Sequence, residues 1–297
     1  MACESNRRII LETDLGRDPD DFFTICLLLA SGVDIAAVTL SPGDSDQVAL
    51  AKCLLRQCGQ TSIPVGVGIM DREKSSVGGA QASYIRKHAQ ADDWKHDGDG
   101  ADIIRDVEGE YEVLAIGPLH SVGRFLQRGG KLNQVTMQGG FVPYSAHTQD
   151  VVRLEKFEGK LEVPTFNLGG NKQGAHRLLN PDMVGKRRFV GKNVCHTVLY
   201  DIPIHERVMR WDAGGLASLA FRELMGVFVE ERGEGFMKAF HDPLAACLML
   251  DPTIGVWMKG KPYYLNGEWG TTPDPDGDDC LIDIDRERFW LWVEEWA

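Results

Sequence analysis

Apolar and polar positions along the first half of the chain alternate between two periods. Short runs rich in β-branched residues are separated by longer segments with the 3.6-residue period of an amphipathic helix. The expected strands are residues 7–13, 34–40, 63–67, 111–116 and 134–137, and the expected helices are residues 20–31, 46–58 and 118–128. Strands that alternate with helices form a mostly parallel sheet through right-handed crossovers. The pattern therefore predicts an α/β protein with an open, Rossmann-like sheet and helices on both faces.

The second half of the chain has a less regular pattern. Residues 141–163 keep no sustained period, which predicts a long functional or mobile loop. Helical periods dominate residues 175–250, and the basic run 186–188 within them is expected to lie in a solvated loop. An acidic segment from residue 268 onward ends in an amphipathic helix over residues 285–296. Because no repeat or Pro/Ser-rich linker divides the sequence, we expect one domain over residues 1–297.

The composition narrows the class of protein. The 297 residues are 43% hydrophobic and 26% charged, as in globular proteins, and 32 basic against 44 acidic residues give a net charge of −12. This balance argues against nucleic-acid binding and suits a protein that collects a metal cation or a neutral or cationic substrate. No apolar run approaches the ~18–20 residues of a membrane span, and no apolar signal segment opens the chain. The seven cysteines form no CxxC pair or zinc spacing, so we expect reduced, buried thiols in a cytoplasmic protein without a membrane partner.

Five carboxylates follow the first expected strand within ten residues. They are Glu12, Asp14, Asp18, Asp20 and Asp21. Ligands of parallel sheets bind at the carboxyl ends of the strands, where these side chains would repel one another unless a cation lay among them. Oxygen ligands without a nearby His or Cys favour Ca²⁺ or Mg²⁺. Capping of the following helix would account for one or two of these acids, but not for five.

Two further motifs are candidates for the same site, although each also has a purely structural interpretation. His241, Asp242 and Pro243 precede an apolar helix, and Asp followed by Pro is a common helix start. The segment Gln138-Gly139-Gly140 follows an expected strand, where glycines either allow close approach of the backbone to a ligand or form a turn.

In their order along the chain, these motifs resemble those of the nucleoside hydrolase family of the inosine-uridine-preferring type and its relatives. The family motif DxDPGxDD is similar to ETDLGRDPDD at residues 12–21, which is two residues longer. The other similar segments are LAIGPL (114–119), VTMQGG (135–140), PTFN (164–167) and KAFHDPLAACLMLDP (238–252), with a weaker match at HDGDG (96–100). The resemblance implies the same α/β fold and hydrolysis of the N-glycosidic bond of a nucleoside or modified nucleoside.

The resemblance also implies roles for individual residues. It assigns one Ca²⁺ ion to Asp14, Asp21, Asp242 and the main-chain carbonyl of Met137, with Asp14 as the base that activates water. His241 would protonate the departing base, a task that suits a side chain titrating near neutrality. The residues assigned to the substrate are Asp20, Asp44, His96, Thr165, Asn167 and Asp242. Family members are commonly dimers or tetramers, so we expect a homo-oligomer that acts on a small nucleoside.

Several positions depart from the family pattern, and they cluster around the sugar. Glu12 stands where the family has Asp, Asp44 where it has a ribose-binding Asn, Thr165 where it has a ribose-binding Glu, and Gln138 where it has Met. Because the acids of the metal site are retained, a metal-dependent nucleosidase is the first hypothesis. The alternatives are a catalytically inactive nucleoside- or cation-binding protein and a Mg²⁺-dependent phosphatase. A phosphatase would need a lysine that neutralises phosphate, and no motif identifies one.

Overall fold

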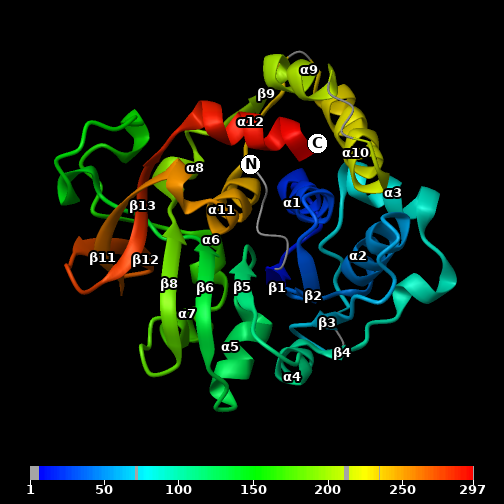
Figure 1. The fold of residues 1–297 in the computed structure, drawn as a ribbon, viewed down its shortest axis with the longest axis horizontal. Coiled ribbons are helices and arrows are strands. Elements are labelled where there is room, and N and C mark those ends of the chain that lie inside the picture. The colour runs from blue at the N-terminus through cyan, green and yellow to red at the C-terminus, as the bar shows by residue number, and fades with distance from the viewer. Residues whose placement is uncertain (1–6, 71–72, 211–213, 234, 297) are drawn as a thin grey trace.

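The computed structural model describes residues 7–70, 73–210, 214–233 and 235–296, and one large sheet forms its centre (Figure 1). Within these residues the sheet has 11 strands in the order β4-β3-β2-β1-β5-β6-β8-β13-β11-β12-β7. The strands of this sheet, in chain order, are β1 (Arg8–Thr13), β2 (Asp34–Leu40), β3 (Val65–Val67), β4 (Gly98–Asp99), β5 (Glu112–Ala115), β6 (Leu132–Gln138), β7 (Glu162–Val163), β8 (Val184–Val190), β11 (Gly255–Leu265), β12 (Glu268–Pro273) and β13 (Asp278–Ile284).

Most of the sheet is parallel. From β4 to β13 each neighbouring pair of strands runs in the same direction, whereas β11, β12 and β7 complete the sheet with antiparallel pairs. The prediction of an open, mostly parallel α/β sheet is confirmed. A separate pair of short antiparallel strands, β9 (Leu199–Asp201) and β10 (Met237–Ala239), lies outside it.

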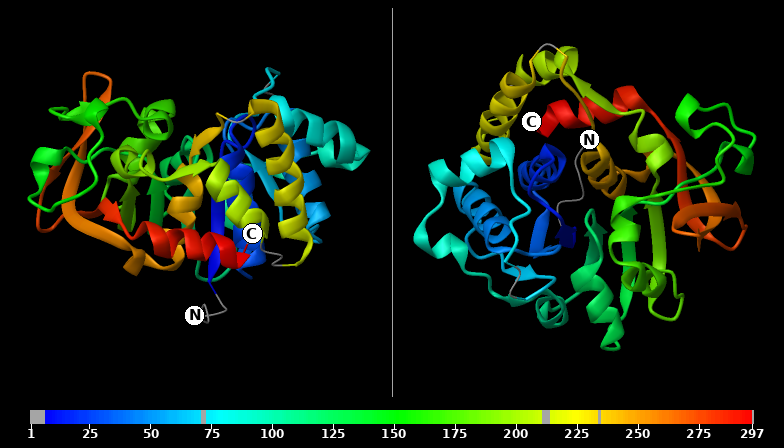
Figure 2. Two further views of the ribbon diagram at one scale, coloured as in Figure 1. Left: turned by 90° about the horizontal axis from the view of Figure 1, so that it is seen from above. Right: turned by 180° about the vertical axis from the view of Figure 1, so that it is seen from behind.

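Helices cover both faces of the sheet, and the sheet separates the apolar core into two clusters. Ile9 and Leu11 of β1 point into one cluster and Ile10 points into the other, as the alternation of a strand requires. The first cluster includes apolar residues of α1 (Pro19–Ala30), α2 (Ser45–Gln57), α3 (Gly79–His88), α10 (Leu216–Arg232), α11 (His241–Leu250) and α12 (Arg286–Trp296). The second includes residues of α4 (Gly100–Asp106), α5 (His120–Gln127) and α7 (Lys172–Leu178). The C-terminal helix α12, drawn in red, packs against α1 and α11 (Figure 2).

Short helices fill most of the remaining connections. They are α6 (Phe166–Gly170), α8 (Lys192–Cys195), α9 (Ile202–Arg210), η1 (Ala91–Trp94), η2 (Tyr144–Ala146), η3 (Glu155–Phe157) and η4 (Pro252–Ile254). None of the helices within the described residues combines the length and the apolar character needed to cross a membrane. The six cysteines in this part of the chain are free thiols, and Cys3 lies outside the described residues.

The structure corrects the sequence analysis in the second half of the chain. The basic run 186–188, expected in a solvated loop, lies inside strand β8. There Arg187 Nε is 2.7 Å from Asp278 Oδ1 of β13, so a neighbouring strand neutralises the charge that argued against a strand. The acidic segment from Glu268 onward likewise forms β12 and β13 before the predicted helix. Residues 141–163 are largely irregular, as expected, and pack around a small apolar cluster that includes Phe141 and Phe157.

A buried carboxylate links strand β1 to the start of helix α5. Glu12 is fully buried, and its two carboxylate oxygens accept hydrogen bonds from the backbone N–H groups of Ser121 and Val122 at 2.8 and 2.9 Å. The Ser41 hydroxyl donates a further bond to Glu12 Oε1 at 2.8 Å. Burial nevertheless raises the pKa of Glu12 to about 7. Glu12 therefore satisfies the free N–H groups of a helix end directly below the ends of the parallel strands.

Replacement of Glu12 by alanine is predicted to destabilise the protein strongly. Each buried N–H left without a partner costs about 1–3 kcal/mol, so we expect Glu12→Ala to lower the free energy of unfolding by about 3 kcal/mol or more. Glu12→Gln retains one acceptor and most of the volume and should cost less. Urea denaturation measures both, with Glu110→Ala as the control because Glu110 is exposed. Equal stability of Glu12→Ala and the control would contradict this role.

Candidate functional site

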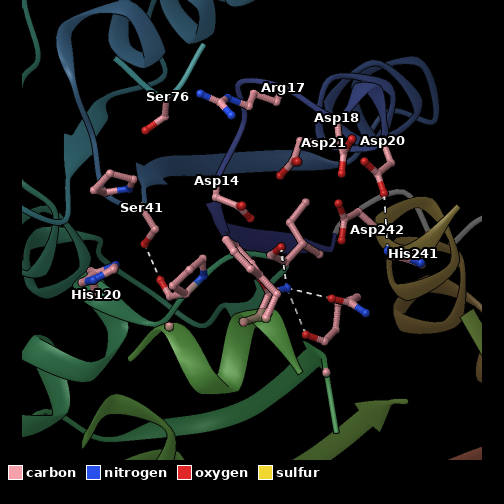
Figure 3. A pocket seen from close by; sticks show the side chains of 18 of the residues that line it. Asp14, Arg17, Asp18, Asp20, Asp21, Ser41, Ser76, His120, His241 and Asp242 are labelled. Atoms are coloured by element: carbon pink, nitrogen blue, oxygen red, sulfur yellow. Dashed lines mark hydrogen bonds and ion pairs between the residues drawn. The ribbon is translucent and has the colours of Figure 1, made fainter. Parts of the chain in front are cut away.

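A pocket of about 860 Å³ lies at the carboxyl ends of the parallel strands (Figure 3). Its walls come from the residues that follow β1, β2, β5 and β6, together with the first turns of α1 and α11. In open α/β sheets ligands bind at this edge, in the crevice where the strand order reverses, which here is between β1 and β5. The pocket is also within the size range of small-molecule sites.

Three buried aspartates converge in this pocket from two distant segments. Asp20 and Asp21 lie in the first turn of α1, where Pro19 starts the helix, and Asp242 lies in the first turn of α11. One carboxylate oxygen from each of the three lies within 4.8 Å of the others. The hydroxyl of Thr13 donates a hydrogen bond to Asp21 Oδ1 and fixes that side chain. Asp14, directly after β1, lines the pocket beside them (Figure 3).

The crowding of these acids shifts their protonation. Burial, together with the charges of Asp20 and Asp18, raises the pKa of Asp14 to about 8. Burial and the neighbouring carboxylates also raise the pKa values of Asp21 and Asp242 well above the ordinary range. In addition, Asp20 Oδ1 is buried without a hydrogen-bond partner. Oxygen atoms gathered in this way fit a divalent cation such as Ca²⁺ or Mg²⁺, which would relieve the repulsion.

One lysine offsets part of the negative charge. Lys238 on β10 places its Nζ 3.1 Å from Asp18 Oδ2 and 3.4 Å from Asp20 Oδ2. Although burial alone would lower the pKa of Lys238, Asp20 and Asp18 raise it above its ordinary value, so the ammonium is charged. No sequence motif singles out Lys238, although it opens the KAFHDP segment that contains His241 and Asp242.

His241 is the first residue of α11 and faces the same pocket. Its Nδ1 is 3.9 Å from Asp20 Oδ2, its ring lies 5.1 Å from the ring of His196, and its Nε2 has no hydrogen-bond partner. Burial and the charge of Lys238 lower the pKa of His241 to about 3. The sequence suggested a side chain that titrates near neutrality, whereas the imidazole in this pocket is neutral at pH 7.

The segment around α6 forms another wall of the pocket. Asn167 Nδ2 donates hydrogen bonds to the Ile116 carbonyl at 2.8 Å and to Gln138 Oε1 at 2.7 Å, which holds the amide in place. Thr165 also lines the pocket, and its hydroxyl is buried without a hydrogen-bond partner. Gln138 and Gly139 reach the pocket from the end of β6, as one of the two interpretations of that motif requires.

Three residues with predicted roles do not line this pocket. The Asp44 carboxylate caps α2 by accepting hydrogen bonds from Asp46 N and Gln47 N, and its other oxygen accepts one from Ser76 N. His96 is exposed and precedes the edge strand β4, away from the carboxyl ends of the strands. The Met137 side chain is fully buried in the second core cluster, and the residues directly after it, Gln138 and Gly139, line the pocket. The role predicted for Met137 belongs to its main-chain carbonyl, which this side-chain packing does not involve.

Comparisons with known proteins identify the family and the fold of this chain. A family model described as inosine-uridine preferring nucleoside hydrolase matches residues 9–291. A search of curated protein sequences gives no significant match. Among solved structures, the plant nucleoside hydrolase PpNRh1 is similar with a TM-score of 0.71 and 20% identity, covering 97% of this chain and 98% of that one.

Two bacterial structures are also similar in fold. A purine-preferring ribonucleoside hydrolase from Gardnerella vaginalis has a TM-score of 0.67 and 15% identity, with 97% of each chain covered. An inosine-uridine preferring nucleoside hydrolase from Bacillus anthracis has a TM-score of 0.67 and 13% identity, covering 98% of this chain and 100% of that one. Because the family model matches nearly the whole sequence, the chain belongs to the inosine-uridine preferring nucleoside hydrolase family, a family of hydrolases that act on nucleosides.

Proposed function

We propose that this protein hydrolyses the N-glycosidic bond of a nucleoside or modified nucleoside with the help of one Ca²⁺ ion. The observation that carries the proposal is the convergence of Asp20, Asp21 and Asp242 beside Asp14 in one pocket. Membership of the family supports the reaction, and the oxygen-only donor set supports the choice of a hard cation. The proposed working form is a cytoplasmic homo-oligomer, as the resemblance implies.

The proposed side-chain ligands are Asp14, Asp21 and Asp242, with the carbonyl of Met137 as a further oxygen. Asp20 contributes an oxygen to the same group, and we propose that its carboxylate accepts a hydrogen bond from a sugar hydroxyl. When bound, the cation would orient the sugar diol and lower the pKa of a coordinated water molecule. Asp44 and His96 have no part in the proposal, because Asp44 caps a helix and His96 is exposed.

Three side chains have separate roles in the proposed reaction. Asp14 accepts a proton from the water molecule that attacks C1′ as the glycosidic bond breaks, through a transition state with oxocarbenium character. Asn167, held by Ile116 and Gln138, offers its carbonyl oxygen to a sugar hydroxyl. The neutral imidazole of His241 presents an N–H to the departing base and stabilises the charge that develops there.

Binding of Ca²⁺ is predicted to release protons at pH 7. The pKa of Asp14 is about 8 in the pocket, so this group carries a proton at neutral pH and must lose it when a cation binds. Calorimetric titration in two buffers with different ionisation enthalpies measures this release, and the contribution of Asp14 should disappear above about pH 9. Asp242→Asn should weaken Ca²⁺ binding at least ~10-fold, whereas Asp92→Asn, at an exposed acid, should not. Binding without proton release and with unchanged affinity in Asp242→Asn would argue against this site.

Replacement of Asp14 by asparagine is predicted to abolish most of the turnover. Asn keeps the size of the side chain but removes the base, which typically contributes ~10²–10⁴ to the rate. A panel of nucleosides, deoxynucleosides and modified nucleosides, with chromatographic detection of the free base, identifies an accepted substrate and measures the loss. Retention of more than a tenth of wild-type turnover would remove Asp14 from this role. Tight binding of nucleosides to the wild type without any release of base would instead favour the inactive binding protein.

The role of His241 is tested by comparing two leaving groups. A natural base is a poor anion and needs a donor, so His241→Ala should slow its release ~10²-fold or more. A nitrophenyl riboside leaves as a stable phenolate and should be little affected, which also shows that the variant is folded. His96→Ala, at an exposed histidine, should change neither rate. Equal losses on both substrates would assign His241 to structure or sugar binding.

A further inference from the structure

Two lysines and a histidine adjoin the acidic cluster. Lys192, the first residue of α8, and His196, directly after that helix, both line the pocket. Lys156 of η3 is exposed and lies outside the pocket lining, with its Nζ 2.9 Å from His196 Nδ1. Through the ring contact between His196 and His241, this cationic wall of Lys156, Lys192 and His196 meets the proposed catalytic residues.

No acid neutralises this wall within the part of the chain that the structure describes. The Lys192 ammonium donates a hydrogen bond to the Pro164 carbonyl at 2.9 Å, and neither Lys192 nor Lys156 takes part in any of the ion pairs between described residues. Partial burial, with the charge of Lys156, lowers the pKa of Lys192. Burial, with His241 and the lysines, lowers the pKa of His196 to about 3, so this imidazole is neutral at pH 7 and the positive charge of the wall comes from the two lysines. Such a concentration of one sign of charge is unfavourable in an empty pocket and becomes favourable when an anion binds.

Polar atoms without partners lie beside the same lysine. Thr165 follows Pro164, whose carbonyl accepts a hydrogen bond from Lys192. The residue is 6% exposed, and its hydroxyl is buried without a partner. Nε2 of His196 is likewise buried without a partner. A buried polar group without a hydrogen bond costs free energy, so these atoms mark a place where a ligand supplies the missing partners.

We propose that the substrate of this pocket is an anionic N-riboside, whose acidic group contacts Lys192, His196 and the Thr165 hydroxyl while its sugar lies over the acidic cluster. The proposal rests on the proposed nucleosidase function. A phosphate on the sugar and a carboxylate on the base offer the same chemistry to this wall. The net charge of −12 favours a neutral or cationic substrate, but within the pocket the local charge of the wall outweighs that average.

Two other cations line the pocket and provide a matched control. Arg17 and Lys74 are exposed on the rim. Charges in contact with water are screened and contribute little to binding, whereas a half-buried ammonium contributes more. Lys192 is therefore the residue on which selectivity for an anion should depend, and Lys74 is its exposed counterpart in the same pocket.

The test compares Lys192→Met with Lys74→Met on neutral and anionic substrates. For each protein, kcat/KM is measured with inosine, inosine 5′-monophosphate and orotidine in the presence of Ca²⁺. We expect the wild type to prefer one of the anionic ribosides over inosine, and Lys192→Met to reduce that preference about 10- to 100-fold through KM, the range for a hydrogen bond to a charged group. Lys74→Met should leave the preference within twofold of the wild type. A preference for the nucleotide would identify a phosphate as the acidic group, and a preference for orotidine would identify a carboxylate on the base.

Binding measurements separate this proposal from the proposed function. Calorimetry with Asp14→Asn, Asp14→Asn/Lys192→Met and Asp14→Asn/Lys74→Met reports the affinity for inosine 5′-monophosphate and orotidine without turnover. Binding that depends on Lys192, in a protein that releases no base from any nucleoside, would reject the nucleosidase and support the anionic ligand. Turnover of inosine with no preference for either anion, or with a preference that Lys74→Met reduces as much as Lys192→Met, would overturn the anionic substrate alone.

Discussion

Repulsion between carboxylates buried at one edge of the sheet is the constraint on which the rest of the pocket depends. One carboxylate oxygen from each of Asp20, Asp21 and Asp242 lies within 4.8 Å of the others, and the pKa of Asp14 beside them rises to about 8. Such an arrangement is unfavourable by itself, so the fold must hold it. The apolar residues of α1 and α11, buried in one core cluster, fix the two helix starts that carry the acids. Packing elsewhere in the protein thus offsets strain at the site.

The pocket separates its charges by position. The acids follow β1 or lie at the starts of α1 and α11, while Lys192 and His196 come from the segment around α8, where Lys156 contacts His196. Lys238 pairs with Asp18 and Asp20 on the acidic side. A ligand with a hydroxyl-rich portion and an acidic portion would match both parts at once. Each part alone would bind many small cations or anions, whereas the distance between the parts selects for one molecule that carries both groups.

Local signals in the sequence identified the first half of the fold and the acidic part of the site. A strand of continuous apolar residues and a helix with an acidic start are each recognisable from their own short segment of sequence, as at β1 and α1. Strand β8 was missed because Arg187 in its basic run is neutralised by Asp278, about 90 residues later in the chain. The cationic wall was missed for the same reason, since α8 and η3 become neighbours only through the fold. Asp44 is different: Gln47, three residues later, completes the pattern of a capping box, so the sequence itself contained the signal of a helix cap.

The distance along the chain between the members of the acidic cluster has a consequence for how the protein is made. Asp20 and Asp242 are about 220 residues apart, and the strands and helices between them must pair before the two can meet. During synthesis the segment 12–21 leaves the ribosome long before α11 exists, and its acids remain hydrated until the last quarter of the chain has been added. A site that needs both Asp20 and Asp242 therefore cannot form before α11 has been made and packed. A cation bound as proposed would join a protein whose sheet and helices are already assembled.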